Sequence, residues 1–251
     1  MKPDAIITDL DRTLLRTDKT ISPYTAEVLR ECRRRGIKVM AATARPLRTA
    51  EPYCGIVPFD AMAVSNGARV ICGGSQTEYG ICRDSAVSIL RNLSRYPGLR
   101  ITAETGDCAY SNLPIEAYET VICEDLTELA GCEKLLKILV TMEEEETLRL
   151  VRGALTSDVY CTVSNGFLIQ IMSRSASKWN GIREMLRLSG CAAENSVYFG
   201  DDYDDIEPIL MCGLGVAVEN AIDEVKAAAD SVTGSNDEDG VAAFLERMLN
   251  Q

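Results

Sequence analysis

The 251-residue sequence contains no histidine. This absence excludes Ser-His-Asp and Cys-His catalysis and any zinc site that depends on histidine ligands. Acid–base chemistry must therefore come from aspartate, glutamate, lysine, tyrosine or cysteine side chains. Ten cysteines are present, but no two of them form a Cys-x-x-Cys pair. We expect buried, reduced thiols and neither a zinc site nor structural disulfides.

Positive charge is also in short supply, since 26 lysines and arginines face 38 aspartates and glutamates, for a net charge of −12. Nucleic acid needs a basic binding surface, so we expect no nucleic-acid partner, while a small anionic substrate remains compatible. No apolar run approaches the length of about 18 residues that spans a membrane, and the first four residues lack the apolar stretch of a signal peptide. We therefore expect no membrane partner and a cytoplasmic location. The oligomeric state stays open.

The pattern of apolar runs, glycines and helix caps predicts an α/β fold built from both ends of the chain. Strands and helices alternate before residue 83 and again after residue 173. The strands expected there cover residues 5–8, 37–42, 61–65, 68–72, 196–199 and 215–218. The helices expected there cover residues 23–35, 178–188, 204–212, 223–229 and 241–249. We expect a Rossmann-like parallel sheet core formed by residues 1–82 and 174–251.

The pattern of residues 83–173 predicts an inserted α+β domain. We predict helices over residues 84–95 and 143–155, and strands over residues 100–104, 109–111 and 135–140, with a helix as the alternative for residues 135–140. Residues 159–164 and 167–172 form the predicted arms of a β-hairpin about Asn165 and Gly166. Four consecutive acids, residues 143–146, are interpreted as a solvated helix start and not as a metal site.

The most informative motif comes directly after the first expected strand, where Asp9 and Asp11 stand two residues apart. A short apolar run that ends in aspartate indicates a buried strand with acids at its carboxyl end, where open α/β sheets bind ligands. Neighbouring carboxylates repel each other, and a hard cation such as Mg²⁺ offsets that repulsion with oxygen ligands. The alternative is a strand followed by an Asp-rich turn.

Three further features lie past a predicted strand or at a helix start. Thr43, Ala44 and the residues after them offer a hydroxyl and backbone amides suited to phosphate oxygens, although Thr43 could instead cap a helix. Lys178 stands near a helix N-terminus, where a cation needs an anionic partner, although a solvent-facing lysine is the alternative. The segment 200–205 places four acids after a strand, as in a cation site. Capping by Asp202 or Asp204 explains only one or two of them.

Taken together, the ordered motifs resemble the haloacid dehalogenase superfamily of aspartate-nucleophile phosphotransferases, and within it the Cof-type phosphatases. The resemblance covers nearly the whole chain. Further stretches that carry it are Ser65-Asn66-Gly67-Ala68, residues 215–221 and residues 236–242. It implies a Rossmann-like core of residues 1–82 and 174–251 with a C2-type cap domain at residues 83–173.

The resemblance also implies roles for individual residues. Asp9 would attack phosphorus and form an aspartyl-phosphate, and Asp11 would act as acid and then base. Mg²⁺ would be held by Asp9, the backbone carbonyl of Asp11 and Asp201, with Asp205 supporting it directly or through water. The residues implied in binding the substrate, a small phosphorylated metabolite of which a sugar phosphate is favoured, are Thr43, Ala44, Asn66, Lys178, Arg12 and Asn220.

The sequence departs from the family pattern at four positions. Arg12, Ala44 and Trp179 stand where the family favours glycine, and Asp204 stands where asparagine is usual. Arg12 is the least expected, because a glycine in a tight turn can adopt positive φ, which arginine adopts only at a cost. We expect it to lie near the phosphate or to neutralise Asp204. A Mg²⁺-dependent phosphatase is the leading hypothesis. A phosphomutase of the same superfamily and a non-catalytic phosphometabolite-binding protein are the alternatives.

Overall fold

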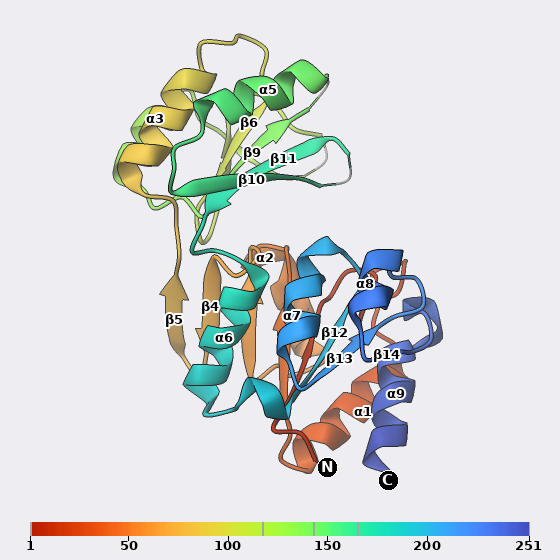
Figure 1. The fold of residues 1–251 in the computed structure, drawn as a ribbon. Helices are drawn as coiled ribbons and strands as arrows, with labels where there is room; N and C mark the ends of the chain where they lie inside the picture. The colour runs from red at the N-terminus through yellow and green to blue at the C-terminus, as the bar shows by residue number, and fades with distance from the viewer. Residues whose placement is uncertain (1, 117, 143, 165, 251) are drawn as a thin grey trace. The chain divides into compact units, whose positions relative to one another are not determined.

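The computed structural model describes residues 2–116, 118–142, 144–164 and 166–250. The chain divides into two compact units. One consists of Met1–Thr77 with Ser177–Gln251, and the other of Glu78–Ala176. Each unit contains its own sheet and its own helices (Figure 1).

The first unit is built on a sheet that, within the described residues, has eight strands in the order β14-β13-β12-β1-β2-β3-β4-β5. Neighbouring strands from β14 to β3 pair in parallel, and β4 returns antiparallel to β3. This confirms the predicted Rossmann-like α/β fold. The strands are β1 (Ala5–Thr8), β2 (Lys38–Ala42), β3 (Ala61–Val64), β4 (Arg69–Cys72), β5 (Ser75–Glu78), β12 (Ser196–Gly200), β13 (Leu214–Ala217) and β14 (Ser231–Val232).

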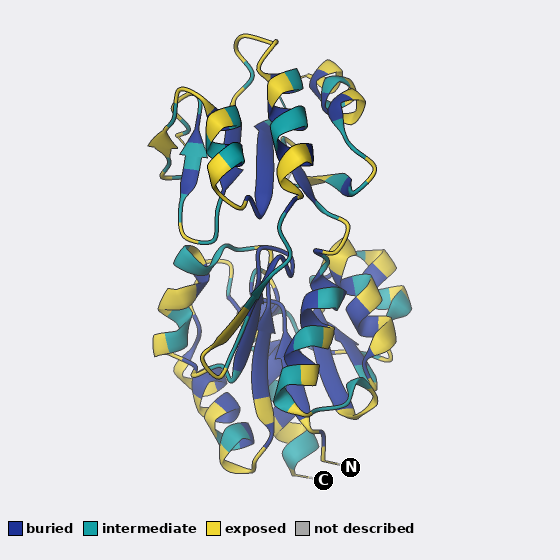
Figure 2. Ribbon diagram, turned by 90° about the vertical axis from the view of Figure 1, so that its left-hand side faces the viewer, coloured by how far each residue is buried: buried dark blue, intermediate teal, exposed yellow. Residues whose placement is uncertain are grey.

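Helices cover both sides of these strands (Figure 2), so the central strands are buried along their whole length. This explains why they are continuous apolar runs with no alternation. The helices and turns of the unit are α1 (Pro23–Arg34), α2 (Leu47–Ala50), η1 (Glu51–Gly55), α6 (Lys178–Ser189), η2 (Ala193–Asn195), η3 (Tyr203–Asp205), α7 (Ile206–Met211), α8 (Asp223–Ala228), η4 (Asn236–Glu238) and α9 (Gly240–Leu249). As predicted, Ser22 caps α1, its hydroxyl accepting from the Thr25 amide at 3.0 Å, and Pro23 occupies the first turn.

The inserted unit has a sheet in the order β10-β11-β9-β6-β7-β8. Its elements are α3 (Arg83–Leu93), β6 (Ile101–Glu104), β7 (Ala109–Ser111), β8 (Val121–Ile122), α4 (Leu126–Cys132), β9 (Lys137–Thr141), α5 (Glu145–Ala154), β10 (Val159–Ser164) and β11 (Leu168–Ser173). A separate apolar core joins the helices to one face of this sheet and includes Ile89, Leu93, Ile138 and Ile171. The predicted β10–β11 hairpin is confirmed by antiparallel pairing of Val159 with Ser173.

Several short elements escaped prediction for identifiable reasons. The strand β5 is polar and largely exposed, so it lacks the apolar pattern that indicates a strand. The helix α4 has only seven residues, which is too short for a clear helical pattern. Its start is capped by Asp125, whose side chain accepts from the amides of Thr127 and Glu128. The expected hairpin residue Asn165 and helix start Glu143 lie outside the described residues. All ten cysteines are free, but only Cys32 and Cys212 are buried, so the expectation of buried thiols is wrong for the other eight. None of the described helices is long and apolar enough to span a membrane.

Candidate active site

The candidate site lies at the carboxyl edge of the parallel strands in the first unit. Asp9 follows β1, Thr43 follows β2 and Asp201 follows β12. These strands are neighbours in the order β12-β1-β2 and run in the same direction. Their ends therefore meet at one edge of the sheet, where α/β proteins bind their ligands.

Three buried carboxylates form the centre of the site. One oxygen each from Asp9, Asp201 and Asp205 lies within 4.8 Å of the other two. Burial raises the pKa of Asp9 well above its usual value, and the charges of Asp205 and Asp201 add to this rise, while Lys178 opposes it. Burial likewise raises the pKa of Asp201 to about 7, although a hydrogen bond from Thr13 acts in the other direction. The cluster thus carries negative charge that the described side chains offset only in part.

Lys178 is the cation at the centre of this cluster. Its Nζ lies 3.0 Å from Asp9 Oδ1, 2.5 Å from Asp205 Oδ1 and 3.2 Å from Asp204 Oδ1. The residue is only 4% exposed, which rules out the solvent-facing alternative. Burial alone would lower the pKa of the ammonium group, but the charges of Asp204, Asp205 and Asp9 outweigh it and hold the pKa well above its ordinary value. Lys178 is therefore a permanently charged group between three carboxylates.

A close backbone approach fixes the start of α6 and with it Lys178. The turn after β3 holds Gly67 at φ +81°, and a side chain there would place its Cβ 2.1 Å from the carbonyl oxygen of Ser177. Gly181, on the next turn of α6, faces Gly67 with similarly little space. Ser177 caps the helix by accepting from the Asn180 amide at 3.1 Å. Glycine is required at position 67 both for its conformation and for this approach.

The loop after β12 uses its acids in different ways. Asp202 caps η3, and its side chain accepts from the Tyr203 amide at 2.8 Å, as the capping interpretation predicted. Asp205 Oδ2 accepts from the amides of Asp201 and Asp202 at 2.8 and 3.0 Å. Its other oxygen accepts from Lys178 and from the hydroxyl of Tyr198 at 2.5 Å each. Two oxygens offer about four lone pairs, so these bonds occupy the Asp205 carboxylate.

The carboxylate of Asp11 lies in a different environment from that of Asp9. Arg45 binds it with two nitrogens, Nε 2.6 Å from Oδ2 and Nη2 2.7 Å from Oδ1, and Lys19 Nζ lies 2.8 Å from Oδ1. Burial would raise the pKa of Asp11, but the hydrogen bonds from Arg45 and Lys19 outweigh it and hold the pKa below its ordinary value. The structure thus separates the two neighbouring acids: Asp9 contacts the buried Lys178, and Asp11 contacts the partly buried Arg45 and the exposed Lys19.

Arg12 pairs with a different acid from the one expected. Its Nε lies 3.7 Å from Asp201 Oδ2, whereas Asp204 is bound by Lys178 and by the Asn66 amide at 2.9 Å. The expectation that Arg12 neutralises Asp204 is therefore wrong, because Asp204 points toward the turn after β3. Arg12 does adopt the positive φ of +60° that its place in the motif indicated.

Thr43 is buried and does not cap the helix that follows. Pro46 holds the cap position of α2, so the capping alternative for Thr43 is wrong. The Thr43 hydroxyl accepts from the Arg45 amide at 3.1 Å, and its carbonyl accepts from the Asn66 amide at 3.0 Å. Ala44 lies between Thr43 and Arg45 in this turn. Asn220 contacts Arg12, as described below.

Four residues with defined contacts in the site were missed by sequence reasoning. They are Thr13, whose hydroxyl donates to Asp201 at 2.7 Å, Tyr198, and the cations Lys19 and Arg45 on Asp11. Thr13 and Arg45 stand inside the motifs already singled out, so their positions were available as a signal. The sequence pattern indicates Tyr198 only as part of an apolar strand. Nothing in the sequence distinguishes Lys19 from other surface lysines.

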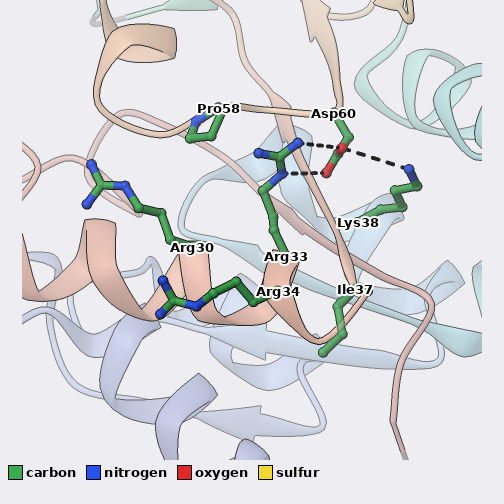
Figure 3. A pocket seen from close by; sticks show the side chains of 8 residues that line it. Arg30, Arg33, Arg34, Ile37, Lys38, Pro58 and Asp60 are labelled. Atoms are coloured by element: carbon green, nitrogen blue, oxygen red, sulfur yellow. Dashed lines mark hydrogen bonds and ion pairs between the residues drawn. The ribbon is translucent and has the colours of Figure 1, made fainter.

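A separate hollow of 570 Å³ lies in the same unit, where β2 begins (Figure 3). Its cationic lining comes from the last turns of α1 and from Lys38. Arg33 is held there by both oxygens of Asp60, and Arg34 binds Glu27 and Glu31. Asp9 follows the other end of the neighbouring strand, so this hollow is not part of the candidate site.

The donor set of the cluster suits a hard divalent cation. Asp9 and Asp201 are buried oxygen donors, and burial together with the neighbouring carboxylates raises their pKa values. Mg²⁺ binds through one or two carboxylates and otherwise through water and phosphate oxygens. The residues present therefore fit Mg²⁺.

Comparison with known proteins identifies the family. The sequence model of the family of haloacid dehalogenase-like hydrolases matches residues 6–245 of this chain. Over 269 residues the chain is 30% identical to the 5-amino-6-(5-phospho-D-ribitylamino)uracil phosphatase YitU of Bacillus subtilis (strain 168), covering 99% of this chain and 98% of that protein. It is 26% identical over 250 residues to the phosphoglycolate phosphatase of Methanopyrus kandleri, with 98% and 97% covered.

Solved structures show the same fold. TM0651 from Thermotoga maritima superposes with a TM-score of 0.89 at 25% identity, covering 98% of this chain and 97% of that one. The subclass IIB sugar phosphatase BT4131 superposes with a TM-score of 0.81 at 22% identity, covering 98% of each chain. The chain therefore belongs to the haloacid dehalogenase-like hydrolases, and within them it is a phosphatase.

Proposed function

We propose that this phosphatase hydrolyses a small phosphorylated metabolite, with a sugar phosphate favoured, through an aspartyl-phosphate on Asp9 and with Mg²⁺ as cofactor. One observation carries the proposal: the buried Asp9 carboxylate lies 3.0 Å from Lys178 and within 4.8 Å of two further acids. This arrangement places a nucleophile beside the fixed positive charge of Lys178 and beside carboxylate ligands for Mg²⁺. We also propose that residues 83–173 are the C2-type cap and that residues 1–82 and 174–251 are the hydrolase core.

The proposed reaction has two steps on one carboxylate. In the first, an Asp9 oxygen forms a bond to phosphorus while the bond from phosphorus to the ester oxygen breaks, and Asp11 gives that oxygen its proton. In the second, Asp11 takes a proton from water, whose oxygen attacks phosphorus and releases Asp9 and inorganic phosphate. Asp11 must carry a proton when the leaving oxygen departs, although Arg45 and Lys19 hold its pKa below the ordinary value before substrate binds. After the second step Asp11 is again protonated, and Asp9 is a free carboxylate.

The metal would be held by Asp9, Asp201 and the backbone carbonyl of Asp11. Bound there, Mg²⁺ would offset the repulsion between an anionic nucleophile and an anionic phosphate. Asp205 supports this site through its neighbours, because its carboxylate is occupied by Lys178, Tyr198 and two amides. It orients the Asp201 loop and fixes the lysine.

The remaining site residues are proposed to bind the phosphoryl group. Lys178 supplies a buried charge that stabilises the transferring oxygens, and the Thr43 turn supplies a hydroxyl and amides. Asn66 is held by Asp204 at the end of β3, beside Thr43. The full set proposed for the substrate is Thr43, Ala44, Asn66, Lys178, Arg12 and Asn220.

Release of phosphate from para-nitrophenyl phosphate tests the proposed function. We expect release with Mg²⁺, little with EDTA, and none from Asp9→Asn, a variant that should keep the fold because Asp9 lies at the strand end. Release by Asp9→Asn equal to wild type would remove Asp9 as the nucleophile. Transfer of the phosphoryl group to an added sugar without net phosphate release would favour the phosphomutase alternative. Phosphate binding without any release would favour a non-catalytic binding protein.

A further inference from the structure

Two cationic side chains converge on the single carboxylate of Asp11. Arg45 contacts both of its oxygens, and Lys19 contacts one of them. One of these cations is enough to pair with an aspartate. The chain as a whole carries a net charge of −12, so a local excess of positive charge beside the candidate site stands out from its surroundings.

The Arg45 guanidinium is held in place independently of Asp11. Its Nη1 donates to the carbonyl of Thr49 at 3.4 Å, and its Cζ lies 5.5 Å from the centre of the Tyr53 ring. Its side chain is 22% exposed, so one edge remains accessible to solvent. A fixed planar donor fork of this kind matches a carboxylate or a phosphate.

Lys19 is presented by a strained but anchored turn. Its backbone adopts φ +66°, a left-handed conformation that a residue with a side chain adopts only at a cost. The turn is fixed by Thr17, whose amide and hydroxyl donate to the two oxygens of Asp237 at 2.8 and 2.7 Å. Backbone strain kept by surrounding contacts is a feature of functional sites. The Lys19 side chain is 50% exposed and accessible to a ligand.

The charges near Asp9 do not account for these cations. Asp9, Asp204 and Asp205 contact Lys178, and Asp201 pairs with Arg12, so a divalent cation would complete the neutralisation of these four carboxylates before substrate binds. An ionised Asp11 offsets only one of the two charges of Lys19 and Arg45, which leaves an excess of one positive charge there before substrate binds. This excess lies at the residue that, in the proposed reaction, faces the leaving oxygen.

We propose that the leaving group of the natural substrate carries a second anionic group close to its ester oxygen, as in a phosphorylated sugar acid, and that Lys19 and Arg45 bind this group. The inference rests on the proposed function and narrows its substrate class. A hydrogen bond that protonated Asp11 donates to the leaving oxygen and one that either cation donates to the second group each span about 3 Å. Because Lys19 and Arg45 directly contact Asp11, these contacts keep the second anion within a few carbon atoms of the ester oxygen.

A matched set of small phosphate esters tests the proposal. The set is 2-phosphoglycolate, 2-hydroxyethyl phosphate, which replaces the carboxylate by a neutral alcohol, and ethylene glycol bisphosphate, which replaces it by a phosphate. We expect kcat/KM to be at least about tenfold higher for one or both anionic esters, because a hydrogen bond to a charged group contributes this much. The two anionic esters distinguish a carboxylate from a second phosphate.

Variants assign the preference to the two cations. Lys19→Met and Arg45→Gln should each reduce the ratio of kcat/KM for the anionic ester to that for 2-hydroxyethyl phosphate about tenfold. Lys38→Met is the matched control, since Lys38 is equally exposed but begins β2 and lies away from Asp11. Dissociation constants for the same esters, measured by calorimetry on Asp9→Asn, should show the same preference without chemistry.

Equal kcat/KM and equal affinity for the charged and neutral esters would overturn the proposal. So would an equal loss for both esters in Lys19→Met, because that result would mean that Lys19 only supports Asp11. A well-folded protein that hydrolyses no ester, including para-nitrophenyl phosphate, contradicts the proposed function instead. In that case the calorimetric comparison still decides whether Lys19 and Arg45 bind a second anion.

Discussion

Arg12 and Asn220 hold each other by a reciprocal pair of hydrogen bonds. The side-chain amide of Asn220 donates to the Arg12 carbonyl at 2.7 Å, and the Arg12 guanidinium donates to the Asn220 carbonyl at 3.2 Å. The Asn220 side-chain oxygen also accepts from the Asn236 amide at 2.9 Å, which ties this contact to the turn before α9. These bonds keep Arg12 in the left-handed conformation that glycine would adopt without cost.

This relationship predicts the ranking of variants at position 12. Arg12→Gly loses an exposed ion pair but relieves the positive φ, whereas Arg12→Ala loses the pair and keeps the strain. We expect the glycine variant to be more stable than the alanine variant by about 1 kcal/mol. Urea denaturation of both proteins measures the difference. Equal stabilities would show that the backbone at residue 12 relaxes when the guanidinium is removed.

Removal of the Lys178 ammonium group should strongly reduce both turnover and stability. Lys178→Met leaves Asp9, Asp204 and Asp205 without their shared cation, so we expect turnover to fall by about 100-fold or more and stability by about 3 kcal/mol. Lys38→Met, an exposed lysine at the other end of the sheet, should change neither. Steady-state kinetics and thermal unfolding make the comparison. Near wild-type turnover in Lys178→Met would remove the lysine from phosphoryl binding.

The stabilisation of the protein by Mg²⁺ should depend on pH. The pKa of Asp201 is raised by burial to about 7 and that of Asp9 is also raised, so without metal both groups favour the folded state at low pH and lose this contribution as the pH rises. Mg²⁺ binds the ionised forms. The increase in melting temperature caused by Mg²⁺ should therefore be larger at pH 8 than at pH 5.5. Asp201→Asn should flatten this dependence, and an equal increase at both pH values in wild type contradicts the assignment.

The role of Asp11 as an acid is tested by the leaving group. Asp11→Asn should lower turnover of an alkyl phosphate by about 100-fold, because a poor leaving oxygen needs a proton. The same variant should lower turnover of para-nitrophenyl phosphate less in the step that breaks the ester bond, since nitrophenolate leaves without one. Single-turnover kinetics on the two esters isolate that step. Equal losses would argue that Asp11 only positions its neighbours.

The core fold could be predicted because its signals are local. The strand β1 is a short apolar run, Ser22 and Pro23 mark the start of α1, and the carboxyl ends of parallel strands bring separated motifs together. The order of Asp9, Lys178 and Asp201 along the sequence was therefore enough to predict one cluster. The polar edge strand β5 carried no such signal.

The pairing of individual charges could not be predicted in the same way. Whether Arg12 contacts Asp201 or Asp204 depends on the direction of two loops, and it is decided by the turn after β3, whose Asn66 binds Asp204. The hydroxyl of Tyr198 reaches Asp205 from within a buried strand, where the sequence shows only an apolar pattern. Lys19 reaches Asp11 because of a left-handed turn at a residue that gives no indication of it.

Trapping the covalent intermediate tests the central claim most directly. The protein would be quenched with borohydride during turnover of para-nitrophenyl phosphate, and the residue at position 9 identified by mass spectrometry, with Lys38→Met as a fold-matched control. Reduction of an aspartyl-phosphate yields homoserine, so we predict homoserine at position 9 that appears only with substrate and Mg²⁺. An unmodified Asp9 in protein that is turning over, or a modified residue elsewhere, would contradict the assignment of Asp9 as the nucleophile.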